Sequence, residues 1–294
     1  MQVGWLGLGA MGAPMAACLA GAGHDVAGYD VVPDHAPQLA GAGVRPTRTI
    51  AAAVDGADVV AVMVATPQQL EHALFGPAGA AAVLAGGTIV MIMATVGPEA
   101  VTATAGRLAG RGVRVIDAPV SGGVARAASG DLLIMVSGPE DSVARVRPLL
   151  GVLARSAPVV GSAPGDGQRM KLVNQLLCGV HIAAAAEALA FAESLGLDPA
   201  RCWEVLRDGA AASFMFEDRG ARMVSGDFGN VRSAMDIFVK DMGLVAGAAG
   251  EASAPVPLAA AARRLYDLGH DQGLGGRDDS ALIEVFRHAR DAAE

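Results

Sequence analysis

Up to about residue 160, short apolar runs alternate with segments of mixed or alanine-rich composition. The apolar runs predict strands over residues 2–6, 25–29, 43–45, 58–64, 88–93, 113–116, 132–137 and 157–160. The segments between them predict helices over residues 13–22, 33–40, 50–54, 67–75, 98–111 and 141–153. The runs at 58–64 and 88–93 are almost uninterrupted, which is typical of parallel strands covered on both faces. Repeated strand–helix alternation predicts an α/β fold with a doubly wound, Rossmann-type parallel sheet.

The pattern changes after the glycine-rich loop at residues 161–167. No convincing strand follows it, and residues 168–195 form one long helical pattern that ends at a glycine. Further helices are predicted over residues 199–208, 216–224, 235–249, 257–268 and 280–293. We therefore expect two domains: an α/β domain over residues 1–162 and an all-α domain over residues 163–294.

The first predicted strand runs into a G-x-G-x-x-G sequence at the start of a helix. Its residues are Gly7, Leu8, Gly9, Ala10, Met11 and Gly12. In this context the first glycine permits a sharp turn and the second lets the backbone approach a pyrophosphate. The third allows close packing of helix on strand, and the phosphates lie at the helix N-terminus. The sequence therefore predicts that this turn binds a dinucleotide.

Asp30 refines the prediction because it directly follows the second strand, where the fingerprint places the partner of the ribose hydroxyls. A carboxylate there accepts hydrogen bonds from the ribose and repels a 2′-phosphate. The following residues, Val31, Val32 and Pro33, supply no arginine to hold such a phosphate. We therefore expect NAD rather than NADP as the cofactor.

Composition limits the binding partners that can be expected and indicates the cellular compartment of the protein. A net charge of −8 argues against nucleic acid and anionic membranes. The most apolar stretch, residues 178–192, is too short to span a bilayer, and a strand that starts at residue 2 leaves no room for a secretory signal. The three cysteines and six histidines show no metal-ligand spacing. We expect a cytoplasmic protein without a bound metal.

Lys171 is the main candidate for chemistry. It lies one turn into the long helix, with Asn174 and Gln175 one turn further on. A lysine against an apolar wall can donate or accept a proton, although a lysine at a helix start is more often simply solvated. Small residues close several predicted strands, where ligands bind in open α/β sheets. Taken singly, these strand ends are more typical of ordinary turns.

Several blocks in the same order resemble the β-hydroxyacid dehydrogenase family along essentially the whole chain. They are residues 7–12, Asp-Ala-Pro-Val-Ser-Gly-Gly at 117–123, residues 165–175, and Lys-Asp-Met-Gly-Leu at 240–244. The resemblance implies a dinucleotide domain, a helical domain and a cleft between them. It implies Lys171 as the catalytic acid/base, and Ser121, Gly122 and Gly123 as the residues that hold the substrate carboxylate. By the same resemblance, the residues that line the cofactor are Val64, Ala65, Gln69, Thr95 and Lys240.

One position departs from the family pattern. The family usually has asparagine four residues after the catalytic lysine, whereas this chain has Gln175, preceded by Asn174. Both amides are expected to bind substrate, in a pocket that differs from that of 3-hydroxyisobutyrate enzymes. The helical half is most similar to the L-threonate dehydrogenase branch.

The resemblance implies NAD-dependent oxidation of a small 3-hydroxy acid, with L-threonate as the first candidate. The alternatives are 3-hydroxyisobutyrate dehydrogenase and tartronate semialdehyde (2-hydroxy-3-oxopropionate) reductase activity. Imine reduction uses the same architecture, but Lys171 argues against it. A catalytically silent NAD-binding protein would need neither Lys171 nor residues 121–123. The apolar helical domain predicts a homodimer or homotetramer.

Overall fold

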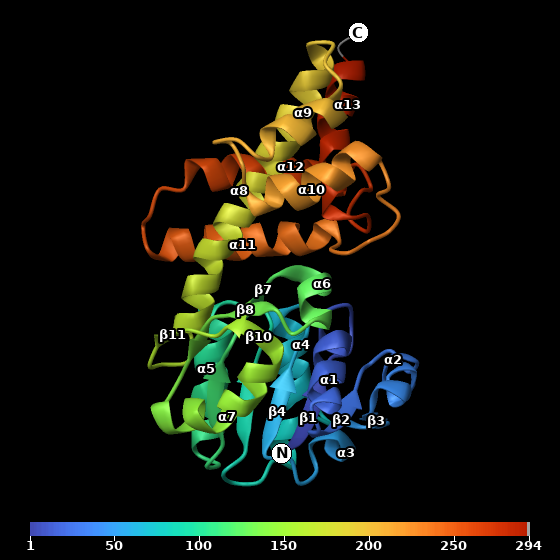
Figure 1. Ribbon diagram of the computed structural model, residues 1–294. Coiled ribbons are helices and arrows are strands. Elements are labelled where there is room, and N and C mark those ends of the chain that lie inside the picture. The colour runs from blue at the N-terminus through green and yellow to red at the C-terminus, as the bar shows by residue number, and fades with distance from the viewer. Residues whose placement is uncertain (293–294) are drawn as a thin grey trace. The chain divides into compact units, whose positions relative to one another are not determined.

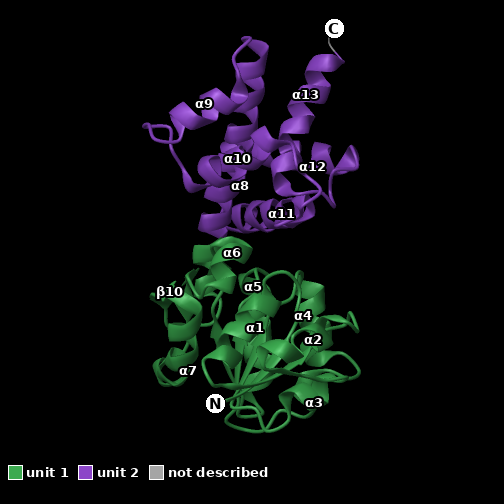
Figure 2. Ribbon diagram, turned by 45° about the vertical axis from the view of Figure 1, so that its right-hand side comes forward, with its two compact units in different colours: residues 1–171 green, residues 172–294 purple. Residues whose placement is uncertain are grey.

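The computed structural model describes residues 1–292. The chain divides into two compact units, Met1–Lys171 and Leu172–Glu294 (Figure 2). The boundary lies within helix α8 (Asp166–Ser194), whose first residues therefore belong to unit 1 and whose remainder belongs to unit 2. The sequence-based boundary lies slightly earlier, in the loop that precedes this helix.

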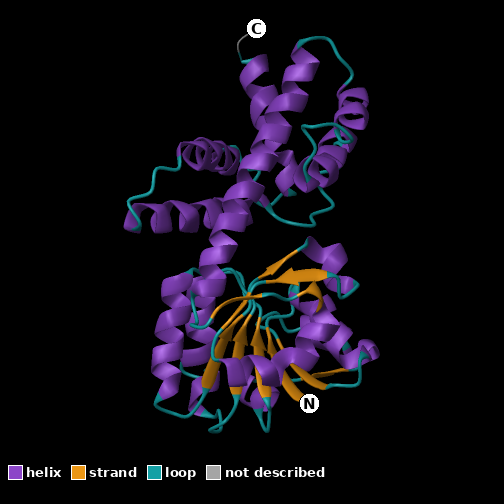
Figure 3. Cartoon of the chain, turned by 60° about the vertical axis from the view of Figure 1, so that its left-hand side comes forward, coloured by secondary structure: helices purple, strands orange, loops and turns teal. Residues whose placement is uncertain are grey.

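Unit 1 is built on an eight-stranded sheet with the order β11-β9-β6-β5-β4-β1-β2-β3 (Figures 1 and 3). Its strands are β1 (Gln2–Leu6), β2 (Asp25–Tyr29), β3 (Val44–Pro46), β4 (Val59–Val62), β5 (Ile89–Ile92), β6 (Arg114–Asp117), β9 (Val136–Ser137) and β11 (Val159–Gly161). Neighbouring strands pair in parallel except β6 and β9, which are antiparallel. This sheet confirms the predicted Rossmann-type fold.

Helices cover both faces of this sheet (Figure 3). The helices of unit 1 that precede α8 are α1 (Gly12–Gly21), α2 (His35–Gln38), η1 (Ala40–Ala42), α3 (Ile50–Val54), α4 (Pro67–Phe75), η2 (Ala80–Ala82), α5 (Pro98–Ala109), α6 (Gly123–Ala128) and α7 (Glu140–Leu153). Alternate residues of β4 enter different hydrophobic cores: Val59 and Ala61 pack in one, and Val60 and Val62 in the other. Burial on both faces explains why this strand reads as an unbroken apolar run.

The structure corrects one predicted strand. Residues 132–137 form two strands, β8 (Leu132–Ile134) and β9, which belong to different sheets. β8 pairs with β7 (Val120–Ser121) and β10 (Ala154–Ser156) in a three-stranded sheet. The chain changes partners at Met135, whose N–H donates to the carbonyl oxygen of Pro119. A continuous apolar run cannot reveal such a change, because burial on either sheet requires the same residue types.

Unit 2 is helical. After α8 it contains α9 (Pro199–Leu206), α10 (Phe214–Ser225), α11 (Met235–Glu251), α12 (Pro257–Asp271), η3 (Asp279–Leu282) and α13 (Ile283–Asp291). Up to residue 292, the only β-type pairing in this unit is an isolated bridge between Ala234 and Asp278. Its core includes the fully buried Tyr266, which stacks on Phe238 at 5.3 Å and donates a hydrogen bond to the carbonyl oxygen of Gly179. The predicted all-α half is confirmed, except that the end of its last predicted helix, residue 293, lies outside the described residues.

Helix α8 is longer than the apolar stretch noted in the sequence. By length and composition alone it could cross a membrane, and half of the relevant window is buried inside the protein. Core helices of water-soluble proteins share these properties, so α8 is weak support for a membrane span. Its buried side carries Leu172, Ile182 and Leu189 into the core of unit 2.

Candidate active site

The glycine turn after β1 has the geometry that the fingerprint requires. Gly7 has φ +95°, and a Cβ atom there would lie 2.2 Å from the carbonyl oxygen of Met63. A Cβ atom on Gly12 would lie 2.0 Å from the carbonyl oxygen of Gly7. Trp5 Nε1 donates a 2.9 Å hydrogen bond to that same oxygen and so fastens the turn to the strand. Both positions therefore require glycine for the turn itself.

Gly9 is different because nothing lies within 4 Å of the position its Cβ atom would take. Leu8 is buried beneath the turn, whereas Ala10 is exposed. Met11 is the N-cap residue of α1, where the first N–H groups of a helix have no intrahelical acceptor. Open space beside such N–H groups suits a pyrophosphate. Residues 7–12 therefore fit a dinucleotide.

Asp30 is anchored to this turn. Its Oδ2 accepts a 2.6 Å hydrogen bond from the Leu8 N–H, and its Oδ1 accepts one of 2.8 Å from the Val32 N–H. The side chain is largely buried, and Val31 and Val32 beside it are exposed. Because a carboxylate oxygen has two lone pairs, each oxygen keeps one for a ribose hydroxyl.

His35 is a neighbour of Asp30 that the sequence analysis did not single out. Its Nδ1 lies 3.3 Å from Asp30 Oδ1, but the pair lacks hydrogen-bond geometry. The proximity is therefore a weak contact rather than a firm ion pair. A histidine a few residues after a turn carries no sequence signal, because only the fold of α2 brings it back to Asp30.

The loop after β4 and the start of α4 contain three of the predicted cofactor residues. Val64 and Ala65 lie in the loop, and Gln69 lies in the first turn of α4. Gln69 Oε1 accepts a 2.7 Å hydrogen bond from the Ala65 N–H, so its side chain shapes the loop. Thr66 caps α4 by accepting from the Gln69 N–H. The predicted residues are thus brought together, and Gln69 already has a local structural role.

Ser121, Gly122 and Gly123 lie where the chain passes from β7 into α6, of which Gly122 is the N-cap and Gly123 the first residue. Ser121 ends β7, and both glycines have positive φ, +143° and +75°. A Cβ atom on Gly122 would lie 3.0 Å from Cδ of Arg126, whereas Gly123 faces open space. Positive φ at two consecutive residues turns the chain sharply and explains why this loop needs glycine.

Lys171 is the last residue of unit 1 and is buried, with 6% of its surface exposed. It lies one turn after Gln168, whose side chain is fully buried and bonds to the end of β5 and to Asp117. Burial raises the pKa of the Asp117 carboxyl, although hydrogen bonds from Gln168, Gly165 and Ser137 oppose this shift. Thr95 lies in the loop after β5, between Ala94 and Val96, whose backbone groups bond to the Gln168 side chain.

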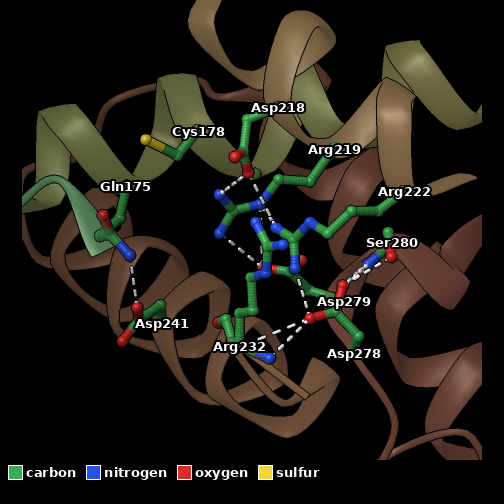
Figure 4. A network of polar contacts seen from close by, with 12 residues as sticks. Gln175, Cys178, Asp218, Arg219, Arg222, Arg232, Asp241, Asp278, Asp279 and Ser280 are labelled. Carbon is green, nitrogen blue, oxygen red and sulfur yellow. Dashed lines mark hydrogen bonds and ion pairs between the residues drawn. The ribbon is translucent and has the colours of Figure 1, made fainter. Parts of the chain in front are cut away.

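The predicted residues of unit 2 form a second group. Gln175 is buried, donates a 2.5 Å hydrogen bond to Asp241 Oδ2 and accepts one of 2.9 Å from Asn174 Nδ2 (Figure 4). Lys240 Nζ lies 2.7 Å from the other Asp241 oxygen. Asp241 therefore connects Gln175 and Lys240, two positions that the sequence analysis treated separately.

A larger buried network in unit 2 joins two arginines of α10 to two aspartates (Figure 4). Arg222 bonds to Asp278, and Arg219 bonds to Asp279 at 3.0 Å. Burial raises the pKa of Asp279 even though Arg219 opposes the shift. At Asp278, hydrogen bonds led by that of Ser280 outweigh burial and lower the pKa. Mutual pairing satisfies these charges, so the network is structural.

Among residues 1–292, no group of three or more His, Cys, Asp or Glu side chains could hold a metal ion. Sequence reasoning did not single out Asp117, Gln168, Asp241 or His35 as site residues. The first three lie within the blocks that resemble the family, and Asp117 is also a polar residue at the end of a buried strand.

Two family models match the chain. The NAD binding domain of 6-phosphogluconate dehydrogenase matches residues 2–161, and the NAD-binding domain of NADP-dependent 3-hydroxyisobutyrate dehydrogenase matches residues 165–286.

Individual proteins match over nearly their full lengths. An L-threonate dehydrogenase from Cupriavidus necator is 43% identical over 97% of this chain and 96% of that protein. The crystal structure of a 3-hydroxyisobutyrate dehydrogenase from Salmonella typhimurium has a TM-score of 0.91 at 36% identity, covering 96% of this chain and 99% of that one. The structure of Psf3 in complex with NADP+ and 2-OPP has a TM-score of 0.87 at 26% identity, covering 96% and 99%.

Proposed function

Because this chain belongs to the β-hydroxyacid dehydrogenase family, we propose that it oxidises a small 3-hydroxy acid, with L-threonate as the first candidate. The family identifies the chain as an oxidoreductase that acts on the hydroxyl group of hydroxy acids and uses a nicotinamide cofactor. L-Threonate comes first because a relative of that name is 43% identical. The alternatives are 3-hydroxyisobutyrate oxidation and 2-hydroxy-3-oxopropionate reduction.

The observation that carries the proposal is the buried Lys171 on the first turns of α8, within the unit that holds the dinucleotide turn. The chain contains 22 lysines and arginines, and only Lys171 and Lys240 are lysines. Arginine stays protonated in proteins and cannot act as a base. Among the lysines and arginines, Lys171 and Lys240 are therefore the two side chains that can give up and take back a proton. This composition supports a chemical role for Lys171.

In the proposed reaction, Lys171 accepts the proton of the substrate hydroxyl and returns it in the reverse direction. The bound nicotinamide supplies the hydride acceptor. Residues Ser121, Gly122 and Gly123 hold the substrate carboxylate through backbone N–H groups and the serine hydroxyl. A free lysine has a pKa of about 10.4, so use near neutral pH requires that the site favour the neutral amine or relay the proton.

For the cofactor we propose NAD. Support comes from the anchored Asp30 carboxylate and from the exposed valines beside it. The cofactor would be held by the turn at residues 7–12 and by Val64, Ala65, Gln69 and Thr95. From unit 2, we propose that Asn174 and Gln175 contribute to substrate binding and Lys240 to cofactor binding.

Substitution of Lys171 tests the catalytic role. In Lys171→Ala and Lys171→Arg, kcat should fall by about 10²–10⁴-fold, because general acid–base catalysis contributes that much. The dissociation constant for NADH, measured by fluorescence, should stay within a few-fold of the wild-type value. Arg169→Ala, an exposed position on the same turn, is the matched control.

A substrate panel should accompany this experiment. It should contain L-threonate, 3-hydroxyisobutyrate, glycerate and tartronate semialdehyde, with NADH absorbance as the readout. Near-normal turnover in Lys171→Ala would refute the catalytic assignment. NADH binding without turnover on any of these acids would favour a silent NAD-binding protein.

We also propose a cytoplasmic homodimer or homotetramer. Support comes from large apolar side chains exposed on α8 and α9, such as Phe191 and Val205. Light scattering on the purified protein measures the oligomeric state directly.

A further inference from the structure

The side chain of Gln168 uses its complete hydrogen-bonding capacity. Its Oε1 accepts from the N–H groups of Val96 at 2.9 Å and Gly97 at 3.0 Å. Its Nε2 donates to the carbonyl oxygen of Ala94 at 3.0 Å and to Asp117 Oδ1 at 2.9 Å. A primary amide has two donors and two acceptor lone pairs, and all four are satisfied here in a fully buried position.

Asp117 adds a second connection between β6 and the start of α8. Its Oδ2 accepts from the N–H groups of Gly165 at 3.0 Å and Gln168 at 2.9 Å. The Gly167 N–H donates to Ser137 Oγ at 2.9 Å. These N–H groups at the beginning of a helix would otherwise lack acceptors. Residues from two neighbouring strands therefore cap α8.

The glycines of this segment allow the close approach. Gly165 has φ +107°, and a Cβ atom on Gly167 would lie 2.9 Å from Asp117 Oδ2 and 2.7 Å from the carbonyl oxygen of Met135. The glycines at positions 165 and 167 thus let the start of α8 pack directly against β6. We call the contacts of residues 165–168 with Asp117, Ser137 and residues 94–97 the α8 junction, and both glycines are required for its packing.

The α8 junction lies next in the chain to three predicted parts of the active site, all within unit 1. Lys171 follows Gln168 by three residues and lies one turn further along α8. Thr95 lies between Ala94 and Val96, whose backbone groups Gln168 holds. Asp117 ends β6, and the chain continues from it to Ser121.

We propose that Gln168, held by Asp117, is a positioning residue that fixes Lys171 relative to the loops containing Thr95 and Ser121. This inference rests on the proposed function, since it assigns Gln168 an effect on catalysis only through Lys171. Gln168 contacts neither the substrate nor the cofactor in this proposal. Its amide determines the place of the first turn of α8, and a small misplacement of a catalytic group costs up to about 10²-fold in rate.

Two substitutions separate this role from general packing. Gln168→Met keeps the volume but leaves Val96, Gly97, Ala94 and Asp117 without their partner. Gln168→Glu keeps the acceptor for Val96 and Gly97 but turns an oxygen towards Ala94 and Asp117. The charged group bonded to this side chain is Asp117 from β6, and the end of β5 contributes backbone groups. On α8 itself the next side chain that can exchange a proton is Lys171, three residues later.

When the carboxyl group introduced by Gln168→Glu is protonated, its O–H group can donate a hydrogen bond in place of the Gln168 Nε2 group, to Asp117 or to the carbonyl oxygen of Ala94. Two carboxyl groups within hydrogen-bond distance share a proton readily, because like charges disfavour double ionisation. As pH falls, the new side chain should therefore regain the bond to Asp117 or Ala94, and the ratio of the kcat of Gln168→Glu to the wild-type kcat should rise. The same ratio for Gln168→Met should stay flat with pH. A purely structural defect would give flat ratios for both variants.

NMR spectroscopy of the 294-residue chain allows Lys171 to be observed directly, because this chain contains two lysines. Labelling with [ε-¹³C]lysine gives two side-chain NMR signals, and Lys240→Arg identifies which one belongs to Lys171. In Gln168→Met we expect kcat to fall by about 10–100-fold, an NADH dissociation constant within a few-fold of wild type, and a shifted or broadened Lys171 signal. Arg169→Met, with the same new side chain on the exposed side of that turn, should match wild type in all three.

A wild-type kcat and an unchanged Lys171 signal in Gln168→Met would overturn the inference. If Gln168→Met does not fold, the pH profile of Gln168→Glu decides: a flat ratio overturns the inference and a rising one supports it. Failure of the proposed function looks different, because then either the wild-type protein would turn over none of the acids in the panel or Lys171→Ala would retain turnover. The Lys171 NMR signal would still report whether Gln168 holds the lysine in place.

Discussion

At the scale of single residues, two glycines of the dinucleotide turn have separable roles. A methyl group on Gly12 would meet the Gly7 carbonyl oxygen at 2.0 Å, whereas one on Gly9 would meet nothing within 4 Å. We expect Gly12→Ala to lower the free energy of unfolding by about 1–3 kcal/mol through overpacking. Gly9→Ala should change it by less than about 0.5 kcal/mol. Urea unfolding without cofactor measures both values.

The same pair tests where the pyrophosphate binds. If it approaches the backbone at Gly9, Gly9→Ala should weaken NADH binding at least tenfold, about 1.4 kcal/mol, while the protein remains as stable as wild type. Fluorescence titration gives this affinity. Unchanged NADH affinity in a stable Gly9→Ala protein would contradict the assigned binding turn.

Asp30 carries the prediction on cofactor choice. Its carboxylate should favour NAD over NADP by at least about 100-fold in kcat/KM, roughly 2.7 kcal/mol, because it repels a 2′-phosphate. Asp30→Ala should lose much of this preference and also weaken NAD binding, since the Leu8 N–H loses its acceptor. The exposed Asp34, mutated to alanine, is the control. Equal kcat/KM values with the two cofactors in the wild-type enzyme would show the preference to be wrong.

At the scale of elements, an ion pair joins the end of α8 to α13 in unit 2. Glu193 accepts hydrogen bonds from Arg287 Nε at 3.2 Å and from Arg290 Nη1 at 3.4 Å. Hydrogen bonds from Arg287 lower the pKa of Glu193 below its ordinary value of 4.5, although partial burial opposes the shift. The folded state therefore favours the ionised form. Its stabilising effect is present above the pKa of the unfolded chain and is lost as pH falls through the lower folded-state pKa.

The lowered pKa of Glu193 in the folded state predicts how the stability of Glu193→Gln depends on pH. Near neutral pH the variant should be less stable than wild type by about 1.5–3 kcal/mol, the range for hydrogen bonds to charged groups. The difference should shrink as pH falls below 4.5. Unfolding by urea at several pH values measures it, with the exposed Glu187→Gln on the same helix as control. A difference that persists unchanged at low pH would mean that the carboxylate charge is not its cause.

At the scale of the whole molecule, local patterns predicted most elements. Helix α4 was predicted over the residues it occupies, because Thr66 and Pro67 mark its start. The order of strands and helices in unit 1 and the helical nature of unit 2 also followed from periodicity. The division of residues 132–137 between two sheets did not, because it depends on pairing partners. The six-residue helix α6 is too short for a periodic pattern, and the two glycines at its start, Gly122 and Gly123, are typical of a loop.

The candidate site divides in the same way. Contiguous motifs predict the turn at residues 7–12, Asp30 and Lys171 as parts of the site. The connection of Asp117 to Gln168 spans 51 residues and exists only because β5, β6 and the start of α8 lie together in the fold. Likewise, Gln175 and Asp241 are 66 residues apart. Such pairs join two residues that each look like ordinary polar positions in the sequence, so tertiary structure is needed to recognise them.

The two units offer one tryptophan each as a reporter: Trp5 beside the dinucleotide turn and Trp203 on α9. A ligand that binds only the folded state at 100 times its dissociation constant adds about 2.7 kcal/mol to the free energy of unfolding. We therefore expect NAD to shift the urea transition of Trp5 fluorescence by that amount in Trp203→Phe. When Gly9→Ala is added and NAD is kept at the same concentration, this shift should fall to about 1.4 kcal/mol or less, because a tenfold weaker affinity leaves NAD at no more than about ten times the new dissociation constant. If NAD moved only the Trp203 signal of the wild-type protein and left Trp5 unchanged, the cofactor would bind outside the β1 turn, and the assignment of residues 7–12 would have to be abandoned.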